Sequence, residues 1–341
     1  MSKYLVKNPL HPFLFIFTLW LVCPLLAVAD ISDRSDVRDF IENMNKKYGF
    51  KADDLLKAFA KVDINQKIID AISRPAEAKP WYEYRPIFMT DKRINGGVEF
   101  WKQHDAALSR AYKEFGVAPE IIVAIIGVES LYGKHRGRYS VLESLSTLAF
   151  NYPKRGGFFK SELEQFLLLA REENMDPVEI KGSYAGAMGK PQFIASSFRQ
   201  YAVDFDNDGK RDLWEDSVDV IGSVANYFAK HNWRKDQPVA SKASVNGNAY
   251  KAIVKKGIRP HTELAKLLKK GIKIEDDDFP ANEKAALIEL ETKDGVEHWV
   301  GMDNFYVITR YNHSELYAMA VYQLSKAIKE KRQVSIATIE P

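Results

Sequence analysis

The chain has 341 residues, a net charge of +3 and one cysteine, Cys23. This length is sufficient for a large core or for roughly two to three subdomains. The near-neutral charge excludes nucleic acid as the main partner, because nucleic-acid-binding proteins normally carry a basic face.

Residues 1–29 are predicted to form a cleavable signal peptide. A basic start precedes a continuous apolar run, and Ala27-Val28-Ala29 has the spacing of a cleavage site. The mature protein would begin near Asp30 and lie in the periplasm. A retained membrane anchor and lipid attachment at Cys23 remain as alternatives. We favour the soluble exported form, because Pro24 directly after the cysteine suits lipid attachment poorly.

Residues 30–110 carry apolar side chains at spacings of three and four, which predicts an N-terminal unit of packed amphipathic helices. The segment 118–130, "APEIIVAIIGVES", is apolar on all sides and has a proline in its first turn. It is therefore expected to be a buried helix. Helical spacing continues beyond it, so residues 111–236 are predicted to form a compact helical core.

Residues 237–311 are predicted to form a small β subdomain. The segments "ALIELET" and "VEHWVGM" flank a turn at Lys293-Asp294-Gly295, and "NFYVITRY" at 304–311 shows the same alternation of β-branched and aromatic residues. Helical spacing returns over 312–331, a helix expected to join the N-terminal unit, and the polar tail after it is expected to fray. The predicted fold class is mainly α (α+β).

The segment 204–215, "DFDNDGKRDLWE", fits a calcium-binding loop of the EF-hand type. Such a loop takes carboxylates at its first, third, fifth and twelfth positions, a glycine at the sixth and a backbone carbonyl at the seventh. The predicted ligands are Asp204, Asp206, Asp208, the carbonyl of Lys210, and Glu215. A single loop of this kind indicates structural calcium rather than a sensor. The alternative is a solvated acidic turn without metal.

Glu129 lies at the end of the apolar segment 118–130, where three interpretations are open: an ordinary helix-end charge, a buried ion pair, or a catalytic acid. Apolar surroundings penalise the charged form, so we expect a raised pKa, as a general acid near neutral pH requires. Ser130 could hydrogen-bond the carboxyl group and contact substrate. Gly133 and Gly137 would leave room for a ligand.

A glycine-rich stretch at 181–198, "KGSYAGAMGKPQFIASSF", has few bulky side chains. A polymer could therefore approach its backbone, with Ser183, Tyr184 and Gln192 offering hydrogen bonds and stacking, and Gln192 is expected to begin a helix. The simpler alternative is a tight connection between two helices.

Four segments carry a more specific resemblance: 127–159 with its E-S-x-Y-G motif, 181–214 with A-M-G-x-x-Q, 219–228, and 304–321 with T-R-Y-N-H-S. In this order they resemble the lytic murein transglycosylase B family, and the similarity extends from about residue 80 to 325. The resemblance implies a lysozyme-like core with an added calcium loop, flanked by helical and small β parts.

The resemblance also implies roles for single residues. Glu129 matches the single catalytic acid/base, and Arg155 matches one of two basic residues that meet peptide or muramyl carboxylates, beside Lys154 where the family often has arginine. For calcium it suggests that Asp219 is the closing ligand, whereas spacing alone selects Glu215. The positions that match glycan contacts and cleft-end residues are Tyr84, Ser183, Gln192, Tyr227, Tyr311 and Asn312.

The implied substrate is the bond between N-acetylmuramic acid and N-acetylglucosamine in peptidoglycan glycan strands. Most glycosidases use two carboxylates, but the conspicuous site supplies only Glu129. The acetamido group of the substrate could replace the second, and the sugar's 6-hydroxyl would then close on C1 to give a 1,6-anhydromuramyl end. Hydrolysis by water and a non-catalytic peptidoglycan-binding protein are the alternatives. Proteins of cell-wall synthesis or remodelling are further candidate partners.

Overall fold

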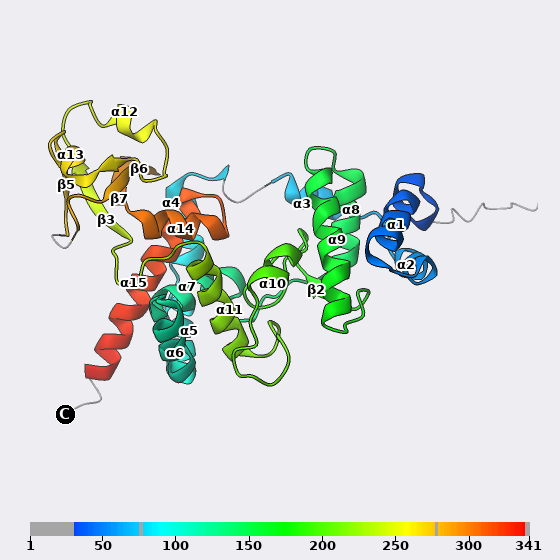
Figure 1. Ribbon diagram of the computed structural model, residues 1–341. Coiled ribbons are helices and arrows are strands. Elements are labelled where there is room, and N and C mark those ends of the chain that lie inside the picture. Colours follow the sequence, from blue (N-terminus) through cyan, green and yellow to red (C-terminus); the bar gives the residue numbers. More distant parts are fainter. Residues whose placement is uncertain (1–30, 75–77, 277–278, 338–341) are drawn as a thin grey trace, which may run out of the picture.

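The structure is a computed structural model that describes residues 31–74, 78–276 and 279–337. The predicted signal peptide and Cys23 lie outside these residues. Within the described ranges, no helix combines the length and the apolar character needed to cross a bilayer. Most of the described chain is helical, with a small sheet at one end (Figure 1).

The centre of the fold is helix α7, Pro119–Ser130, which begins with the proline and buries nearly every side chain. Four helices contact it directly. They are α5 (Asp91–Gln103), α6 (Asp105–Phe115), α11 (Ser217–Lys230) and α15 (Glu315–Ala337). The prediction of a buried helix over 118–130 is thereby confirmed.

The first helices lie at the opposite end of the molecule from the sheet, beside α8 (Val141–Asn151) and α9 (Gly156–Glu172) (Figure 1). Phe40 of α1 packs edge-on against Phe59 and Phe150. The helices concerned are α1 (Ser35–Tyr48), α2 (Ala52–Phe59) and α3 (Gln66–Ile72), preceded by the 3-10 turn η1 (Ile31–Asp33).

Helix α4, Trp81–Phe88, and helix α5 instead contact α15. The contacts of the segment 30–110 are therefore divided between two parts of the molecule. Of the helices in this segment, the C-terminal helix α15 packs with α4 and α5. It does not join α1–α3, because their apolar faces are covered by α8 and α9.

The C-terminal sheet is antiparallel with strand order β4-β6-β7-β3-β5. Strands β6 and β7 form the predicted hairpin, with Thr292 paired to Gly295 across the turn. A small separate core beneath the sheet includes Ile253 and Leu267. The elements are β3 (Ala240–Val245), α12 (Lys251–Val254), β4 (Thr262–Glu263), α13 (Leu264–Leu268), β5 (Ile272–Ile274), β6 (Lys284–Thr292) and β7 (Gly295–Gly301).

The expectation of strand structure at 304–311 is wrong. This segment is helix α14, Asp303–Tyr311, in which Phe305 and Ile308 are buried at helical spacing. The Asn304 side chain holds its first turn, since its amide nitrogen donates to the carbonyls of Arg234 and Gln237. Of the tail that was expected to fray after residue 331, residues 332–337 continue helix α15 to Ala337, and residues 338–341 lie outside the described ranges.

Candidate active site

Glu129 is half-buried in the last turn of α7. The three residues that follow Ser130, the last residue of this helix, have left-handed backbones, with φ of 51° at Leu131, 59° at Tyr132 and 87° at Gly133. Such angles are unfavourable for residues with a side chain, so neighbouring contacts must hold them. The chain therefore reverses sharply directly after the carboxylate.

The side chain of Tyr132 fixes this reversal. Its hydroxyl donates to the carbonyl of Arg93 at 2.7 Å, and its ring lies against α5 and α7 where both have glycines. A Cβ atom at Gly127 would come within 2.5 Å of the Tyr132 hydroxyl oxygen. The small residues of these helices thus make space for the ring that locks the turn after Glu129.

Tyr317 of α15 donates a hydrogen bond to the Glu129 carboxylate, with 2.5 Å between the oxygens. Tyr317 is only 3% exposed. Burial, and next the negative charge of Glu129, raise the pKa of Tyr317 well above its ordinary value. The phenol therefore stays protonated and remains a donor to this carboxylate.

Tyr311 and Tyr227 form an aromatic wall beside Tyr317. The Tyr311 ring lies parallel to the Tyr317 ring, with 6.4 Å between their centroids. The centroid of the Tyr311 ring is 4.8 Å from that of the Tyr227 ring. Both hydroxyls are engaged by the backbone: that of Tyr227 donates to Arg310 at 2.5 Å and that of Tyr311 to Pro191 at 2.6 Å. The wall is thus held rigidly at the side of the site.

Ser183 and Gln192 lie in the loop between β2 (Lys181–Gly182) and α10 (Ala195–Tyr201), so Gln192 does not begin a helix as expected. The Ser183 hydroxyl oxygen accepts from two loop amides, which leaves its hydrogen available. The Gln192 amide nitrogen donates to the carbonyl of Gly189 at 2.8 Å. Among the described residues nothing occupies the amide oxygen of Gln192, so it can accept from a ligand.

The glycines near the site make room for the protein itself, contrary to the expectation that they make room for a polymer. A Cβ at Gly137 would lie 2.0 Å from the backbone of Gly182, and one at Gly189 would lie 2.4 Å from the carbonyl oxygen of Leu213. Gly137 precedes β1 (Tyr139–Ser140), which pairs with β2. The stretch 181–198 is therefore a tightly packed connection.

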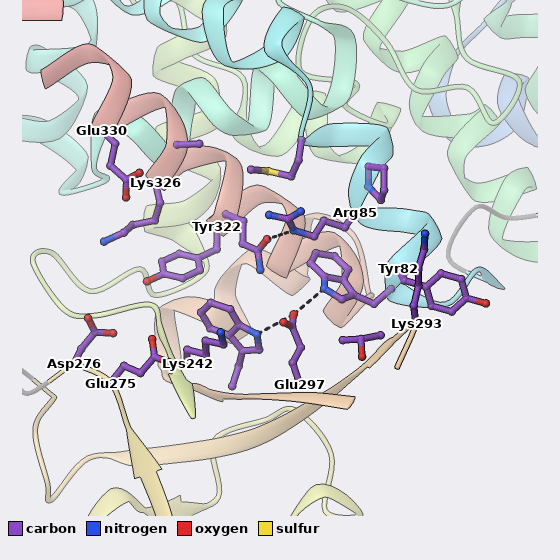
Figure 2. Close-up of a pocket in the computed structure, with 17 residues that line it drawn as sticks. Tyr82, Arg85, Lys242, Glu275, Asp276, Lys293, Glu297, Tyr322, Lys326 and Glu330 are labelled. Atoms are coloured by element: carbon purple, nitrogen blue, oxygen red, sulfur yellow. Dashed lines mark hydrogen bonds between the residues drawn. The ribbon is translucent and has the colours of Figure 1, made fainter. Parts of the chain in front are cut away.

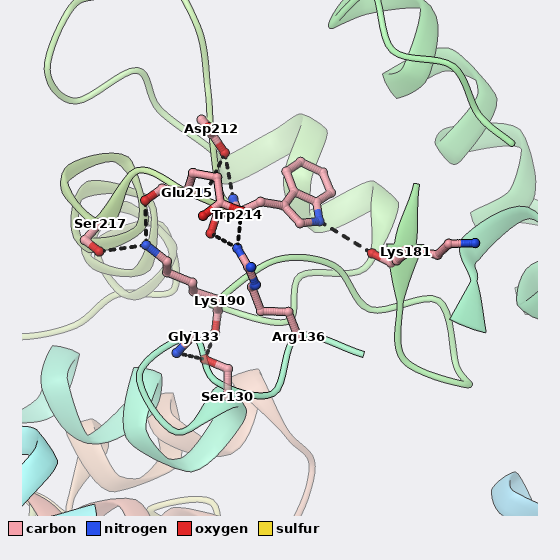
Figure 3. A network of polar contacts seen from close by, with 9 residues as sticks. All are labelled: Ser130, Gly133, Arg136, Lys181, Lys190, Asp212, Trp214, Glu215 and Ser217. Carbon is pink, nitrogen blue, oxygen red and sulfur yellow. Dashed lines mark hydrogen bonds and ion pairs between the residues drawn. The ribbon is translucent and has the colours of Figure 1, made fainter. Parts of the chain in front are cut away.

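Ser130 is only 1% exposed and supports the turn from within, which corrects the expectation of a substrate contact. Its hydroxyl donates to the carbonyl of Lys190 at 2.7 Å and accepts from the amide of Gly133 at 3.0 Å (Figure 3). The Lys190 ammonium group donates to the carbonyl of Glu215 at 2.6 Å and to the Ser217 hydroxyl at 2.8 Å. This network links the turn after Glu129 to residues 204–219, which we call the acidic loop.

The remaining predicted positions differ in accessibility. Tyr84 is 1% exposed and packs on Trp81, so it supports the site from behind. Arg155 is exposed and lies over the ring of Phe158, 4.4 Å from its centroid. Asn312 is half-buried at the end of α14. Burial lowers the pKa of His313, as do the positive charges of Arg310 and Arg155, which places Arg155 close to this end of α14.

In the acidic loop, carboxylate oxygens of Asp204, Asp206 and Asp219 lie within 4.8 Å of one another. Asp219 is 1% exposed and accepts backbone amides at both oxygens. Burial raises its pKa, and a bound cation would offset this penalty. Asp208 and Lys210 belong to the same turn, where the Asp208 carboxylate accepts the Lys210 amide at 2.9 Å.

Glu215 is not part of this group. Its carboxylate accepts from the Arg136 guanidinium at 2.5 Å and its side chain is 74% exposed. Of the two candidates for the closing ligand, the geometry favours Asp219 over Glu215. Hard oxygen donors in this number and spacing suit calcium.

Residues 32–326 match the family described as the Transglycosylase SLT domain. The chain belongs to this family. It is 42% identical over 309 residues to the membrane-bound lytic murein transglycosylase B of Escherichia coli (strain K12), a match that covers 88% of this chain and 84% of that protein.

Solved structures of lytic transglycosylases have the same fold. The soluble lytic transglycosylase SltB1 from Pseudomonas aeruginosa is 49% identical, with a TM-score of 0.82 over 87% of this chain and 99% of that chain. E. coli Slt35 in complex with calcium is 41% identical (TM-score 0.80; 89% and 95% covered). SltB3 from P. aeruginosa in complex with NAG-anhNAM-pentapeptide is 31% identical (TM-score 0.77; 86% and 79% covered). The predicted fold class, mainly helical and lysozyme-like, is confirmed.

Within this SLT-domain chain, two residues of the site were not predicted from the sequence. Tyr317 is one aromatic residue among several on an amphipathic helix, and nothing in its spacing singles it out. Lys190 lies in the quoted A-M-G-x-x-Q segment, but its role depends on Ser130 and Glu215, which are far away in the chain. Both roles depend on tertiary contacts.

Proposed function

We propose that the protein is a peptidoglycan lytic transglycosylase in which Glu129 is the single catalytic acid/base. The observation that carries the proposal is the hydrogen bond from the buried Tyr317 hydroxyl to the half-buried Glu129 carboxylate, at 2.5 Å. The relative from E. coli is named a lytic murein transglycosylase, which supports the same substrate class here.

Several other carboxylates of residues 111–236 are engaged by protein groups. Glu143 accepts from the Asn65 side chain at 2.8 Å, and Glu162 from the amide of Ser196 at 3.0 Å. Glu215 is paired with Arg136, and Asp219 is in the acidic loop. These positions favour a mechanism in which the substrate supplies the group that a second carboxylate would supply in most glycosidases.

The proposed reaction cleaves the β-1,4 bond between N-acetylmuramic acid and N-acetylglucosamine. Glu129 gives its proton to the leaving oxygen, and the 2-acetamido oxygen of the muramyl residue stabilises C1 as an oxazolinium ion. The Glu129 carboxylate then removes the proton of the 6-hydroxyl, which closes on C1 as a 1,6-anhydro bond. SltB3 in complex with NAG-anhNAM-pentapeptide supports this product.

Tyr317 acts through Glu129. Its hydrogen bond orients the carboxyl group, and it strengthens as negative charge develops on the oxygen during proton transfer. Charge-assisted hydrogen bonds of this kind are about twice as strong as neutral ones. The phenol therefore stabilises the state that removes the 6-hydroxyl proton.

Glycan binding is assigned to the accessible polar groups. The Ser183 hydroxyl and the Gln192 amide oxygen offer one donor and one acceptor to the sugar chain, and Arg155 meets a muramyl or peptide carboxylate. The aromatic wall and Asn312 limit where the glycan strand can lie. Ser130 and Tyr84 are buried, and they support the residues of the site without contacting the glycan.

Calcium is the proposed structural ion, consistent with the calcium complex of Slt35. The carboxylates of Asp204, Asp206 and Asp219 and the carbonyl of Lys210 would hold it, with Asp208 as a further oxygen donor. A bound ion would neutralise the acidic loop. Through Lys190 the ordered loop then supports the backbone turn that follows Glu129.

Export to the periplasm is proposed from the signal-type sequence of residues 1–29 and from the E. coli relative, which is named membrane-bound. We expect the mature protein in the soluble periplasmic fraction of a producing cell. Recovery only with membranes, reversed by Cys23→Ala, would instead show the lipid-anchored form.

The decisive experiment digests purified sacculi and analyses the products by mass spectrometry. We expect anhydro-muropeptides from the wild type and nearly none from Glu129→Gln, which keeps the shape and removes the titrating proton. Glu120→Gln, at the other end of the same helix, is the matched control and should remain active. Products that contain one more water would show a hydrolytic muramidase, and binding to sacculi without any product would show a non-catalytic protein.

A further inference from the structure

A cavity of about 670 Å³ lies between α4, α15 and the sheet, and none of the predicted site residues lines it. Its volume is within the range of small-ligand sites. Figure 2 shows side chains from α4, from α15 and from the sheet side converging on this space. The cavity thus has walls from three parts of the fold that are distant in the sequence.

The cavity has a fixed aromatic floor. The indole nitrogens of Trp81 and Trp299 both donate to one carboxylate oxygen of Glu297, at 2.8 and 3.2 Å. Tyr322 meets Trp299 edge-on, with centroids 6.2 Å apart, and its hydroxyl is bound to the carbonyl of Ala240. The rings of Trp299 and Tyr322, held in this way, present apolar surface to a ligand at little entropic cost, whereas Trp81 is 2% exposed and supports them from beneath.

The charges around the floor balance in number but do not pair. The lining contains four basic and four acidic side chains. Among the described residues, no carboxylate lies within ion-pair distance of Lys242, Lys293 or Lys326, and the carboxylates of Asp276 and Glu330 have no cation partner either. A lining that is neutral overall does not suit a polyanion or a polycation.

The charges are unevenly distributed: three of the four acids lie toward one side, where Lys242 also lies, and Glu297 lies between them and the Arg85 side (Figure 2). Asp276 and Glu330 lie at one end, together with Glu275 and Lys326, whereas Arg85 and Lys293 lie at the other. The Arg85 guanidinium is oriented by a bond from its Nε to the Gln323 side chain at 2.6 Å. The other two guanidinium nitrogens can form a bidentate pair of hydrogen bonds with a carboxylate.

We infer that this cavity is a second binding site, for a short peptide that carries a free amine toward one end and a free carboxylate toward the other. The acidic end receives the amine, the Arg85 end receives the carboxylate, and the aliphatic part of the peptide covers the aromatic floor. Peptidoglycan stem peptides carry a free amine on their diamino acid and a free α-carboxylate on their γ-linked glutamate, so this identification of the ligand rests on the proposed function.

Helix α4 connects the cavity with the active site. Trp81 belongs to the cavity floor, and the adjacent ring of Tyr84, 6.5 Å away, lies near enough to Tyr317 to contribute to the raised pKa of its phenol. A stem peptide held in the cavity would keep a neighbouring part of the cell wall beside the strand that Glu129 cleaves.

The test is titration calorimetry of the mature protein with the sugar-free tripeptide N-acetyl-L-Ala-γ-D-Glu-meso-diaminopimelate, whose acetyl group replaces the amide to muramic acid. We expect saturable binding that weakens about fivefold in Arg85→Gln/Lys293→Gln and about fivefold in Asp276→Asn/Glu330→Gln, the size of one or two partly exposed ion pairs. Acetylation of the diaminopimelate amine should have the same effect as Asp276→Asn/Glu330→Gln. Lys331→Gln, on α15 outside the cavity, is the matched control and should bind normally.

Binding that both double variants leave unchanged, or that Arg155→Gln removes instead, would overturn the inference. So would binding of chitotetraose in the cavity in place of the peptide, which would show a sugar site. Because the tripeptide contains no glycosidic bond, this result is independent of turnover. Inactivity towards sacculi with retained peptide binding would refute only the proposed function.

Discussion

Replacing Tyr317 by Phe tests the polar contact made to Glu129. The substitution removes one hydroxyl and leaves the ring in its parallel arrangement with Tyr311, 6.4 Å away. The lost bond joins a phenol and a carboxylate at 2.5 Å. A hydrogen bond to a charged group contributes about 1.5–3 kcal/mol.

This bond strengthens as Glu129 gives up its proton, so its loss should act on the chemical step. At about 1.4 kcal/mol per factor of ten, kcat should fall about 10- to 150-fold while KM stays nearly constant. The assay is the rate of anhydro-muropeptide release at several concentrations of soluble glycan strands.

Tyr112→Phe is the matched control. It also removes a phenol that donates to a carboxylate, that of Asp236 at 2.7 Å, but at a distant surface position. It should leave kcat unchanged. If Tyr317→Phe also had a kcat within a factor of two of the wild type, Glu129 would not depend on this donor and the assigned role would be wrong.

Further predictions concern the acidic loop and the backbone. Calcium should raise the melting temperature of the wild type by roughly 5 °C at saturation. Asp219→Asn should remove most of this rise, whereas Glu215→Gln should retain it. The opposite pattern in thermal melts would make Glu215 the closing ligand. Lys190→Met should lower kcat about tenfold even in saturating calcium, through loss of charged hydrogen bonds, and unchanged rates would show that the loop and the turn are uncoupled. Gly137→Ala should lower the free energy of unfolding by about 3 kcal/mol or more, because of the clash with Gly182 and the φ of 90°, as urea denaturation would measure.

Local patterns predicted the parts of the fold that depend on neighbouring residues. Proline at 119 and the apolar run after it were sufficient for α7, and the turn at 293–295 was sufficient for the β6–β7 hairpin. The segment 304–311 was misassigned because Phe305, Val307 and Ile308 satisfy the spacing of a strand and that of a helix. The helix forms because it buries Phe305 and Ile308 against the rest of the fold.

Only those site residues that belong to a recognisable sequence motif could be predicted. Spacing alone favoured Glu215 as calcium ligand, but the chain turns so that Glu215 meets Arg136 and Asp219 meets the other acids. Glycines interpreted as space for substrate are filled by backbone from other segments. The donor to Glu129 comes from a helix 188 residues later, which no local pattern can indicate.

The central claim is that the sugar's own 6-hydroxyl, rather than water, completes the reaction started by Glu129. The most direct measurement is mass spectrometry of muropeptides released from sacculi by the mature protein in water enriched in oxygen-18. We predict 1,6-anhydromuramyl products without the heavy isotope. Products with reducing ends that carry one oxygen-18 atom would contradict the account and identify water as the nucleophile.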